Sequence, residues 1–293
     1  MSLSFAVKIE NKIQLETVLK LNTVSDVIIS RDSFGELELE SLVTKIKGNG
    51  KKAYILMERI SRFEDTSLSK VMRDTTNRIL EIKNLDGIII QNLDSFQYIL
   101  RKINVVANKN LEVNMNYTMN CYNSITKEVL TSFYNEKREN AKEVPLTFTA
   151  PVELNIYEIN DVGFDSIILY SYIDTMVTAN CLKKDTIEKN FKNNNLCKSR
   201  FNQDRINTYT SYIYDRKGKK VNYKTYCKYC YNKIYNTVPL YLLDKIEEIE
   251  SLSKRKLKYR IDFSFENEKE VKDIILLKNP LEFTRGHYKN SIV

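Results

Sequence analysis

The sequence predicts an α/β protein, a (β/α)8 TIM-barrel-like single domain with a cysteine-rich basic insertion between its seventh and eighth strands. Three observations support this prediction: eight short apolar segments, helical patterns between most of them, and one long polar interruption after the seventh. Short, mostly apolar runs are typical of parallel strands that are covered on both faces. The length of 293 residues also suits such a barrel. An open, doubly wound sheet is the alternative.

The expected strands and helices alternate along the chain. The strands are residues 5–9, 27–29, 53–57, 87–90, 111–115, 146–149, 167–170 and 259–263. The helices with apolar residues at helical spacing are residues 13–21, 37–46, 68–82, 125–133, 240–252 and 268–278. Asn123 and Ser124 have the residue types of a helix cap ahead of the fourth of these. Only 7 Gly and 4 Pro are present, which argues against an all-β protein rich in tight turns.

We expect one structural domain in three stretches. Residues 1–170 would form the first seven β/α units, residues 171–257 the insertion with a helix, and residues 258–293 the last strand, a helix and the tail. A loop in such a fold adds only about 2–6 residues to its helix, so most of the second stretch is inserted. It leaves the carboxyl end of a strand, which is where TIM-barrel active sites lie.

The net charge of +8 is concentrated in the insertion. From Cys181 to Lys233 there are 14 Lys and Arg but only four Asp and Glu, and tyrosines are interleaved with them. Cations that hold phosphates, beside rings that stack on bases, are typical of proteins that bind single-stranded RNA. Lys217, Lys219 and Lys220 are the candidate RNA contacts. The alternative is a solvated basic face over a small core packed with tyrosines.

The single histidine, His287, limits the possible chemistry. A zinc protease of the HExxH type needs two histidines, and serine or cysteine catalytic triads need one in the right place. We expect His287 to be a packed or hydrogen-bonded residue of the tail. The sequence has no apolar run of membrane-spanning length and no apparent signal peptide, so we expect a cytoplasmic protein with no membrane partner.

Four of the five cysteines lie in the insertion: Cys181, Cys197, Cys227 and Cys230. Their spacing is C-x15-C-x29-C-x2-C, in which the C-x2-C pair directs two thiolates at one metal and two distant cysteines complete the shell. Spacing alone leaves a structural zinc and an iron–sulfur cluster equally open. The alternative is that they are small buried apolar residues, although such residues seldom crowd into a polar insertion. Cys121 stands apart and is expected in the core.

Several motifs around these cysteines carry a resemblance to a known family. They are residues 176–182 (MVTANCL), 215–218 (DRKG), 226–232 (YCKYCYN), 234–236 and 239–240, with further pieces at 116–117, 120–124, 153–155 and 284–288. This set resembles the collagenase-like peptidases, peptidase family thirty-two of unassigned catalytic type, over about residues 84–293. The Leu-Ala-Pro-Ala-Gly-like opening of short members is absent, so the chain is most similar to the cysteine-rich C-terminal part of the longer members.

The resemblance implies a barrel-like fold and a 4Fe–4S cluster held by the four cysteines of the insertion. It also implies two different activities, because some members are peptidases whereas others take part in hydroxylating RNA bases or a quinone precursor. No nucleophile, base and oxyanion hole can be identified together here, which favours hydroxylation of RNA bases or of a related small aromatic substrate. Hydrolysis of peptides is the alternative. The third possibility is a noncatalytic module that needs a partner module or the rest of a longer chain.

Polar residues that follow the expected strands are candidates for the site, because they would ring the mouth of a barrel. The catalytic candidates are Glu153, Arg59 and Asn155, and the substrate-binding candidates are Arg62, Asn92 and Asn116. Glu153 is the natural general acid or base, and two arginines can hold a carboxylate or phosphate through paired hydrogen bonds. The alternative for each Arg and Asn is that it caps a neighbouring helix.

Overall fold

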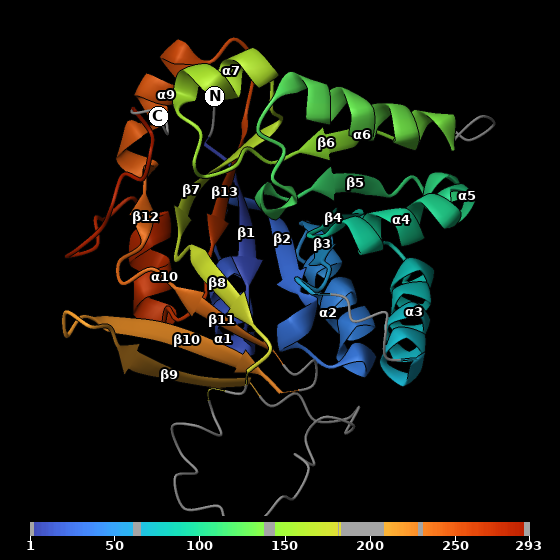
Figure 1. Ribbon diagram of the computed structural model, residues 1–293, viewed down its shortest axis with the longest axis horizontal. Coiled ribbons are helices and arrows are strands. Elements are labelled where there is room, and N and C mark those ends of the chain that lie inside the picture. Colours follow the sequence, from blue (N-terminus) through green and yellow to red (C-terminus); the bar gives the residue numbers. More distant parts are fainter. Residues whose placement is uncertain are drawn as a thin grey trace, which may run out of the picture.

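A large curled parallel sheet and a separate antiparallel sheet make up this mixed α/β protein (Figure 1). The structure is a computed structural model that describes residues 3–60, 66–137, 144–180, 182, 208–227 and 231–289. The parallel sheet has the strand order β12-β7-β13-β1-β2-β3-β4-β5-β6, and the antiparallel sheet has the order β8-β11-β10-β9. None of the described helices has the length and the apolar character needed to cross a bilayer.

Eight of the nine strands in the large sheet are parallel to one another. They are β1 (Phe5–Ile9), β2 (Val24–Ser30), β3 (Lys52–Leu56), β4 (Gly87–Ile90), β5 (Glu112–Met115), β6 (Leu146–Phe148), β7 (Ser166–Ser171) and β13 (Lys258–Asp262). Each coincides with one of the eight apolar segments, so the prediction of parallel strands is confirmed. Strands covered on both faces require continuous apolar residues, which is why the sequence marks them clearly.

Helices connect the parallel strands. They are α1 (Lys12–Leu19), α2 (Glu36–Gly48), α3 (Thr66–Glu81), α4 (Leu93–Arg101), α5 (Ile103–Asn108), α6 (Ser124–Glu136), α7 (Ile156–Val162), α9 (Ile246–Leu252) and α10 (Glu268–Ile275), with short 3-10 helices η1 (Arg31–Ser33), η2 (Tyr117–Met119) and η4 (Leu243–Lys245). Asn123 caps α6 as expected, since its side chain accepts the Thr126 N–H. The expected helix 240–252 is wrong at its start, because residues 240–241 form the short strand β12 (Leu240–Tyr241).

The parallel sheet curls until β6 approaches β7, but the two strands meet at one point. Thr149, just beyond β6, forms an isolated parallel bridge with Ser166 at the start of β7. Further along β7, Leu240 of β12 pairs antiparallel with Ser171. The strand β12 therefore occupies the edge of β7 that β6 would need for a longer contact. The sheet is a half-barrel, and the complete TIM barrel expected from the sequence is not clearly formed.

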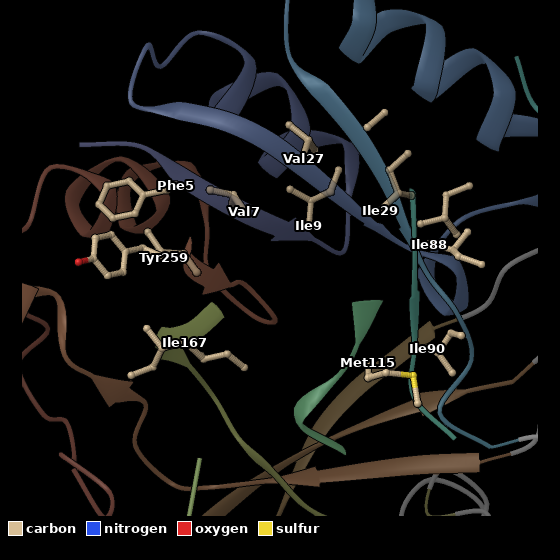
Figure 2. Close-up of a cluster of buried hydrophobic side chains, with 14 of the residues drawn as sticks. Phe5, Val7, Ile9, Val27, Ile29, Ile88, Ile90, Met115, Ile167 and Tyr259 are labelled. Atoms are coloured by element: carbon tan, nitrogen blue, oxygen red, sulfur yellow. The ribbon is translucent and has the colours of Figure 1, made fainter. Parts of the chain in front are cut away.

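The main core lies between the sheet and its helices. Phe5, Val7 and Ile9 of β1 are fully buried there (Figure 2). They belong to one cluster with Val18 of α1. Side chains alternate across a strand, so the residues between them face the inside of the curl. Lys8 is one of these, and it is buried as well. The inner face of the sheet is thus where buried charged groups gather.

The antiparallel sheet lies in the chain between β7 and β13. Its strands are β8 (Asp174–Thr178), β9 (Thr208–Tyr214), β10 (Lys220–Tyr226) and β11 (Tyr231–Tyr235). In Figure 1 the arrowheads of β1 and β2 point toward this sheet. Hydrogen bonds join its side chains to residues that follow β1 and β2, as described below. It therefore covers the carboxyl ends of the parallel strands.

Candidate functional site at the carboxyl ends of the parallel strands

Glu10, the residue after β1, is the centre of a buried charge cluster. Its Oε2 lies 2.6 Å from Nζ of Lys224 and accepts from the Tyr226 hydroxyl at 3.1 Å, while Oε1 lies 2.9 Å from Nζ of Lys8. Ser33 donates to the same carboxylate at 2.5 Å. Burial opposes the ionisation of Glu10, but the lysines more than offset it and hold the pKa well below its usual range. Glu10 is therefore a fixed negative charge that anchors β10.

Asp32, in η1 after β2, differs from Glu10 because its charge is poorly compensated. The Tyr231 hydroxyl donates to Oδ2, and the Lys233 ammonium lies 3.8 Å from the same oxygen. Within the described part of the chain, Oδ1 is buried and has no hydrogen-bond partner. Burial is the main cause that raises the pKa of Asp32 to about 6. Asp32 can therefore gain or lose a proton near neutral pH, which makes it the strongest acid–base candidate of the site.

A second buried ion pair lies beside Asp32. Arg31 donates to the Glu58 carboxylate, and both side chains are buried. The other oxygen of Glu58 accepts from the Ser95 hydroxyl at 3.1 Å, and the Asn92 side chain donates to the Glu58 carbonyl at 2.9 Å. These contacts tie together the residues that follow β2, β3 and β4.

Arg260 and Asp262, two residues apart on β13, form the third charged pair. Nε of Arg260 donates to Oδ1 of Asp262 at 2.5 Å and Nη2 donates to Oδ2 at 2.8 Å. Nη1 reaches across to Oδ1 of Asn116, the residue after β5, at 2.8 Å. The Asn116 amide donates in turn to Thr118 at 3.2 Å and to Gln91 at 3.4 Å. Asn116 is thus held in one orientation by hydrogen bonds to a residue of β13 and to residues that follow β4 and β5.

Arg59 lies at the outer side of this network and is about a quarter exposed. Its Nη1 donates to the carbonyls of Gln91 and Thr118, at 3.2 and 3.3 Å. Its Nε lies 3.6 Å from Asp174 of β8, whose other carboxylate oxygen accepts from the Tyr117 hydroxyl at 2.5 Å. Of the candidates named from the sequence, Arg59 and Asn116 are therefore brought together through shared partners.

Two asparagine candidates act as helix caps, the alternative for residues at strand ends. The Asn92 side chain accepts from the Ser95 N–H at 2.8 Å and begins α4. The Asn155 side chain accepts from the Tyr157 and Glu158 N–H groups at 2.9 and 3.0 Å and begins α7. Their amide oxygens are therefore occupied by backbone donors.

Of the other residues singled out in the sequence, Glu153 and His287 are not joined to the network. Glu153 is half-buried and forms no hydrogen bond or ion pair among the described residues. Arg62 lies outside the described residues. His287 is exposed and has no hydrogen bond among the described residues, so the expectation of a packed or hydrogen-bonded residue is wrong. No described contact gives either Glu153 or His287 a nucleophile to activate.

Glu10, Asp32, Arg260 and Asp262 are the residues that sequence reasoning missed. The first two follow expected strands in the same way as Asn92, so their position was a usable signal. The other two alternate with apolar residues within the last expected strand, and charges at every second position indicate a polar inner face. Their pairing across strands, however, depends on the curl of the sheet.

The three lysines expected to contact RNA lie at the tip of the β9–β10 hairpin, where all three are exposed. The Asp215 carboxylate accepts the backbone N–H groups of Lys217 and Lys219, each at 2.8 Å, and so fixes the turn. Gly218 adopts a φ of 74° there, a conformation that favours glycine. Lys220 lies at the start of β10, with its ammonium 4.3 Å from the Tyr212 ring centroid.

Of the four cysteines expected to bind metal, Cys181, Cys197 and Cys230 lie outside the described residues. Cys227 is buried directly after β10. Over the described ranges, no three His, Cys, Asp or Glu side chains gather as a metal site. Cys121, which precedes the insertion in the sequence, is buried in the main core as expected, and burial raises the pKa of its thiol to about 11. A thiol that stays protonated is a poor metal ligand.

Comparison with known proteins does not assign the chain to a family. No family model and no curated protein matches it. Two solved structures are weakly similar to it. The U32 peptidase Mk0906 is 13% identical, with a TM-score of 0.41 over 59% of this chain and 71% of its own. The structure described as the "C-terminal domain of putative chitinase from Desulfitobacterium hafniense DCB-2" is 11% identical, with a TM-score of 0.44 over 94% and 98%. Such low scores establish neither family nor function.

Proposed function

We propose that this chain holds a four-thiolate iron–sulfur cluster in its insertion and assists the hydroxylation of RNA bases or of a related small aromatic substrate. The observation that carries the proposal is that described neighbours of the cysteines meet at one end of the antiparallel sheet. Tyr226, beside Cys227, pairs with Tyr231, beside Cys230. Asn232 pairs with Thr178, and its side chain also contacts the carbonyl of Asn180, next to Cys181.

The start of β9 lies at this same end of the sheet, so the fourth cysteine, Cys197, precedes a strand that begins near the described neighbours of the other three. Tyr226 pairs with Thr208, the first residue of β9, on the side away from β11. Cys197 precedes Thr208 by 11 residues, a length of chain that can return to the end of the sheet. An all-cysteine donor set fits a 4Fe–4S cluster and, equally, a structural zinc. A bound iron–sulfur cluster would supply electron transfer.

The hairpin at the opposite end of the sheet supports the choice of RNA as the substrate. Arg216, Lys217, Lys219 and Lys220 supply four cations beside the single carboxylate of Asp215, which is used in the turn. The exposed rings of Tyr212 and Tyr214 lie next to them. Exposed rings between cations are the combination that binds the bases and phosphates of a single strand.

The length of β10 separates the two ends of the proposed site. Seven residues from Lys220 to Tyr226 span about 20 Å in an extended strand. RNA that contacts the hairpin would therefore have to run along the sheet for several nucleotides to bring a base to the cysteines. We expect the hairpin to position the RNA and not to take part in the chemistry.

Metal analysis after anaerobic purification tests the proposal. We expect a brown protein with about four irons per chain and absorption in the visible range. Cys227→Ser should lose this iron, whereas Cys121→Ser, the matched control outside the insertion, should keep it. Stoichiometric zinc in place of iron would leave a structural site and remove the basis for hydroxylation. Full metal content in Cys227→Ser would contradict the shared site.

Peptide hydrolysis is the alternative outcome to be examined with the same purified protein. The carboxyl ends of β1 and β2 are engaged by lysines and tyrosines of the antiparallel sheet, so we expect no cleavage of gelatin. Cleavage that Glu153→Gln abolishes would replace our proposal with a peptidase. A chain with neither metal nor affinity for RNA would indicate the noncatalytic module.

A further inference from the structure

A pocket of about 740 Å3 opens beside the carboxyl end of β7, apart from the charge cluster described above. Tyr170 of β7 and Tyr172 just beyond it form one wall. Phe265 and Glu266, which follow β13, form another together with α10, and the residues before β12, including Pro239, add apolar surface. A pocket of this size can enclose a small organic molecule.

Glu266 is 4% exposed and brings a buried carboxyl group to the wall of this pocket. The Tyr170 hydroxyl donates to Oε1 at 2.7 Å, and the Ser264 and Phe265 N–H groups donate to Oε2 at 2.5 and 2.8 Å. Three donors favour the ionised carboxylate, but burial outweighs them and raises its pKa. Among the described residues no lysine or arginine forms an ion pair with Glu266. The negative charge is therefore hydrogen-bonded but not neutralised.

Glu266 differs in this respect from the other carboxylates buried near the carboxyl ends of the parallel strands. Each of those lies 3.8 Å or less from a lysine or arginine; they are Glu10, Asp32, Glu58 and Asp262. Two lysines line the pocket, but Lys278 pairs with Asp273 at 2.7 Å, and Lys269 is exposed and does not contact Glu266. A buried carboxylate is costly unless a cation accompanies it. The pocket therefore has room for the cation that the described chain does not supply.

Two aromatic rings lie beside this carboxylate. The rings of Tyr172 and Phe265 meet edge to face, with their centroids 5.4 Å apart and an angle of 81° between their planes. Burial, and then the negative charges of Glu266 and Glu270, raise the pKa of the Tyr172 hydroxyl to about 12, so this ring stays neutral in the field of both carboxylates. Perpendicular rings next to a negative charge are the surroundings that hold ammonium groups. The apolar walls suit an organic cation better than a metal ion, which prefers a shell of oxygen ligands.

We propose that this pocket binds a small alkylammonium ion, with the ammonium group between Glu266 and the rings of Tyr172 and Phe265. The aliphatic chain of the ligand would lie against the apolar wall that includes Pro239. The ligand would thus do for Glu266 what a lysine of the antiparallel sheet does for Glu10. Neither a cysteine nor a hairpin lysine of the described chain lines the pocket, so the inference is independent of the proposed function.

Calorimetric titration of the purified full chain with n-pentylammonium tests the proposal. We expect n-pentanol, a neutral molecule of similar shape, to bind at least about 10-fold more weakly, because it cannot neutralise the carboxylate. Glu266→Gln should weaken the binding of pentylammonium at least about 10-fold and leave that of pentanol unchanged. Glu247→Gln removes the same charge from the exposed side of α9 and is the matched control, which should keep the wild-type affinity. No binding to the wild type, or equal binding of amine and alcohol, would overturn the proposal.

A second variant keeps the test decisive if Glu266→Gln does not fold. Tyr172→Leu removes one ring face but none of the hydrogen bonds to Glu266, so circular dichroism should show a folded protein. Its affinity for pentylammonium should fall at least about threefold, whereas that for pentanol should not change. An unchanged affinity for pentylammonium in the folded variant would contradict the site.

The same titration distinguishes the two sources of an alkylammonium group, a free amine and the side chain of a lysine. Nα-acetyl-lysine amide carries the same ammonium group and aliphatic chain as part of a peptide unit. Tighter binding of this compound than of pentylammonium would support a lysine of another protein as the ligand. Weaker binding would support a free amine. Binding of neither compound would overturn the proposal.

Discussion

The Nζ atom of Lys224 lies 2.6 Å from Oε2 of Glu10, and this buried contact joins the antiparallel sheet to the end of β1. Similar contacts join Tyr231 and Lys233 to Asp32 after β2. The two sheets are therefore held together at these points by hydrogen-bonded charges. Buried ion pairs of this kind recover the cost of desolvation only when both partners are present. The position of the insertion thus depends on a few specific residues.

Loss of the Lys224 ammonium should destabilise the protein. Lys224→Met leaves the buried Glu10 with one lysine fewer, and we expect the free energy of unfolding to fall by about 3 kcal/mol. Urea denaturation measures this change. Lys219→Met, at the exposed hairpin tip, is the control and should change the value by less than about 0.5 kcal/mol. Equal losses in the two variants would show that the buried pair does not hold the sheets together.

The stability contributed by Asp32 should depend on pH between about 4 and 7. Burial raises its pKa to about 6, so the folded protein binds the proton more tightly than the unfolded chain does. Its protonation therefore stabilises the fold at low pH, and this stabilisation is lost as the pH rises through 6. When the pH is lowered from 7 to 5, the free energy of unfolding of the wild type should rise by on the order of 1 kcal/mol relative to that of Asp32→Asn. Urea denaturation of both proteins at the two pH values tests this, and equal pH dependence would refute it.

Gly87 at the start of β4 should not tolerate a side chain. A Cβ atom there would lie 2.5 Å from the Glu112 carbonyl oxygen and 2.8 Å from the Tyr54 ring. We expect Gly87→Ala to lower the free energy of unfolding by about 2 kcal/mol through this overpacking. Gly48→Ala, in α2, meets no atom within 4 Å and should be neutral or stabilising. A loss in Gly48→Ala as large as that in Gly87→Ala would contradict the steric explanation.

The hairpin lysines should carry the salt-dependent part of RNA binding. Replacing Lys217, Lys219 and Lys220 with Gln should weaken binding of a single-stranded oligonucleotide and reduce the slope of log affinity against log salt by about 2. Fluorescence anisotropy at several salt concentrations measures both. A control triple of exposed lysines elsewhere, at positions 20, 83 and 256, removes the same net charge. If both triple variants weaken binding equally, the RNA responds to the net charge of the protein and does not bind specifically at the hairpin.

The sequence by itself determined the order and type of the main elements. Eight short apolar runs identify the parallel strands, because strands covered on both faces must be apolar throughout. Asn123 likewise identifies the start of α6, since a cap depends only on residues within one turn. The crowding of cysteines and cations into residues 181–233 is also readable without a structure. These features depend on neighbours in the chain.

Only the tertiary structure decided which charges meet. Lys224 and Lys233 resemble the other lysines of the insertion in sequence, yet they are buried against Glu10 and Asp32 while Lys217 remains in solvent. The pairing of β12 with β7, which limits closure of the sheet, is equally invisible beforehand. Such contacts join residues up to 214 positions apart, and their energies depend on the burial that the whole fold creates. Local pattern cannot reveal them, because the low-dielectric surroundings that make a pair necessary exist only after the chain has folded.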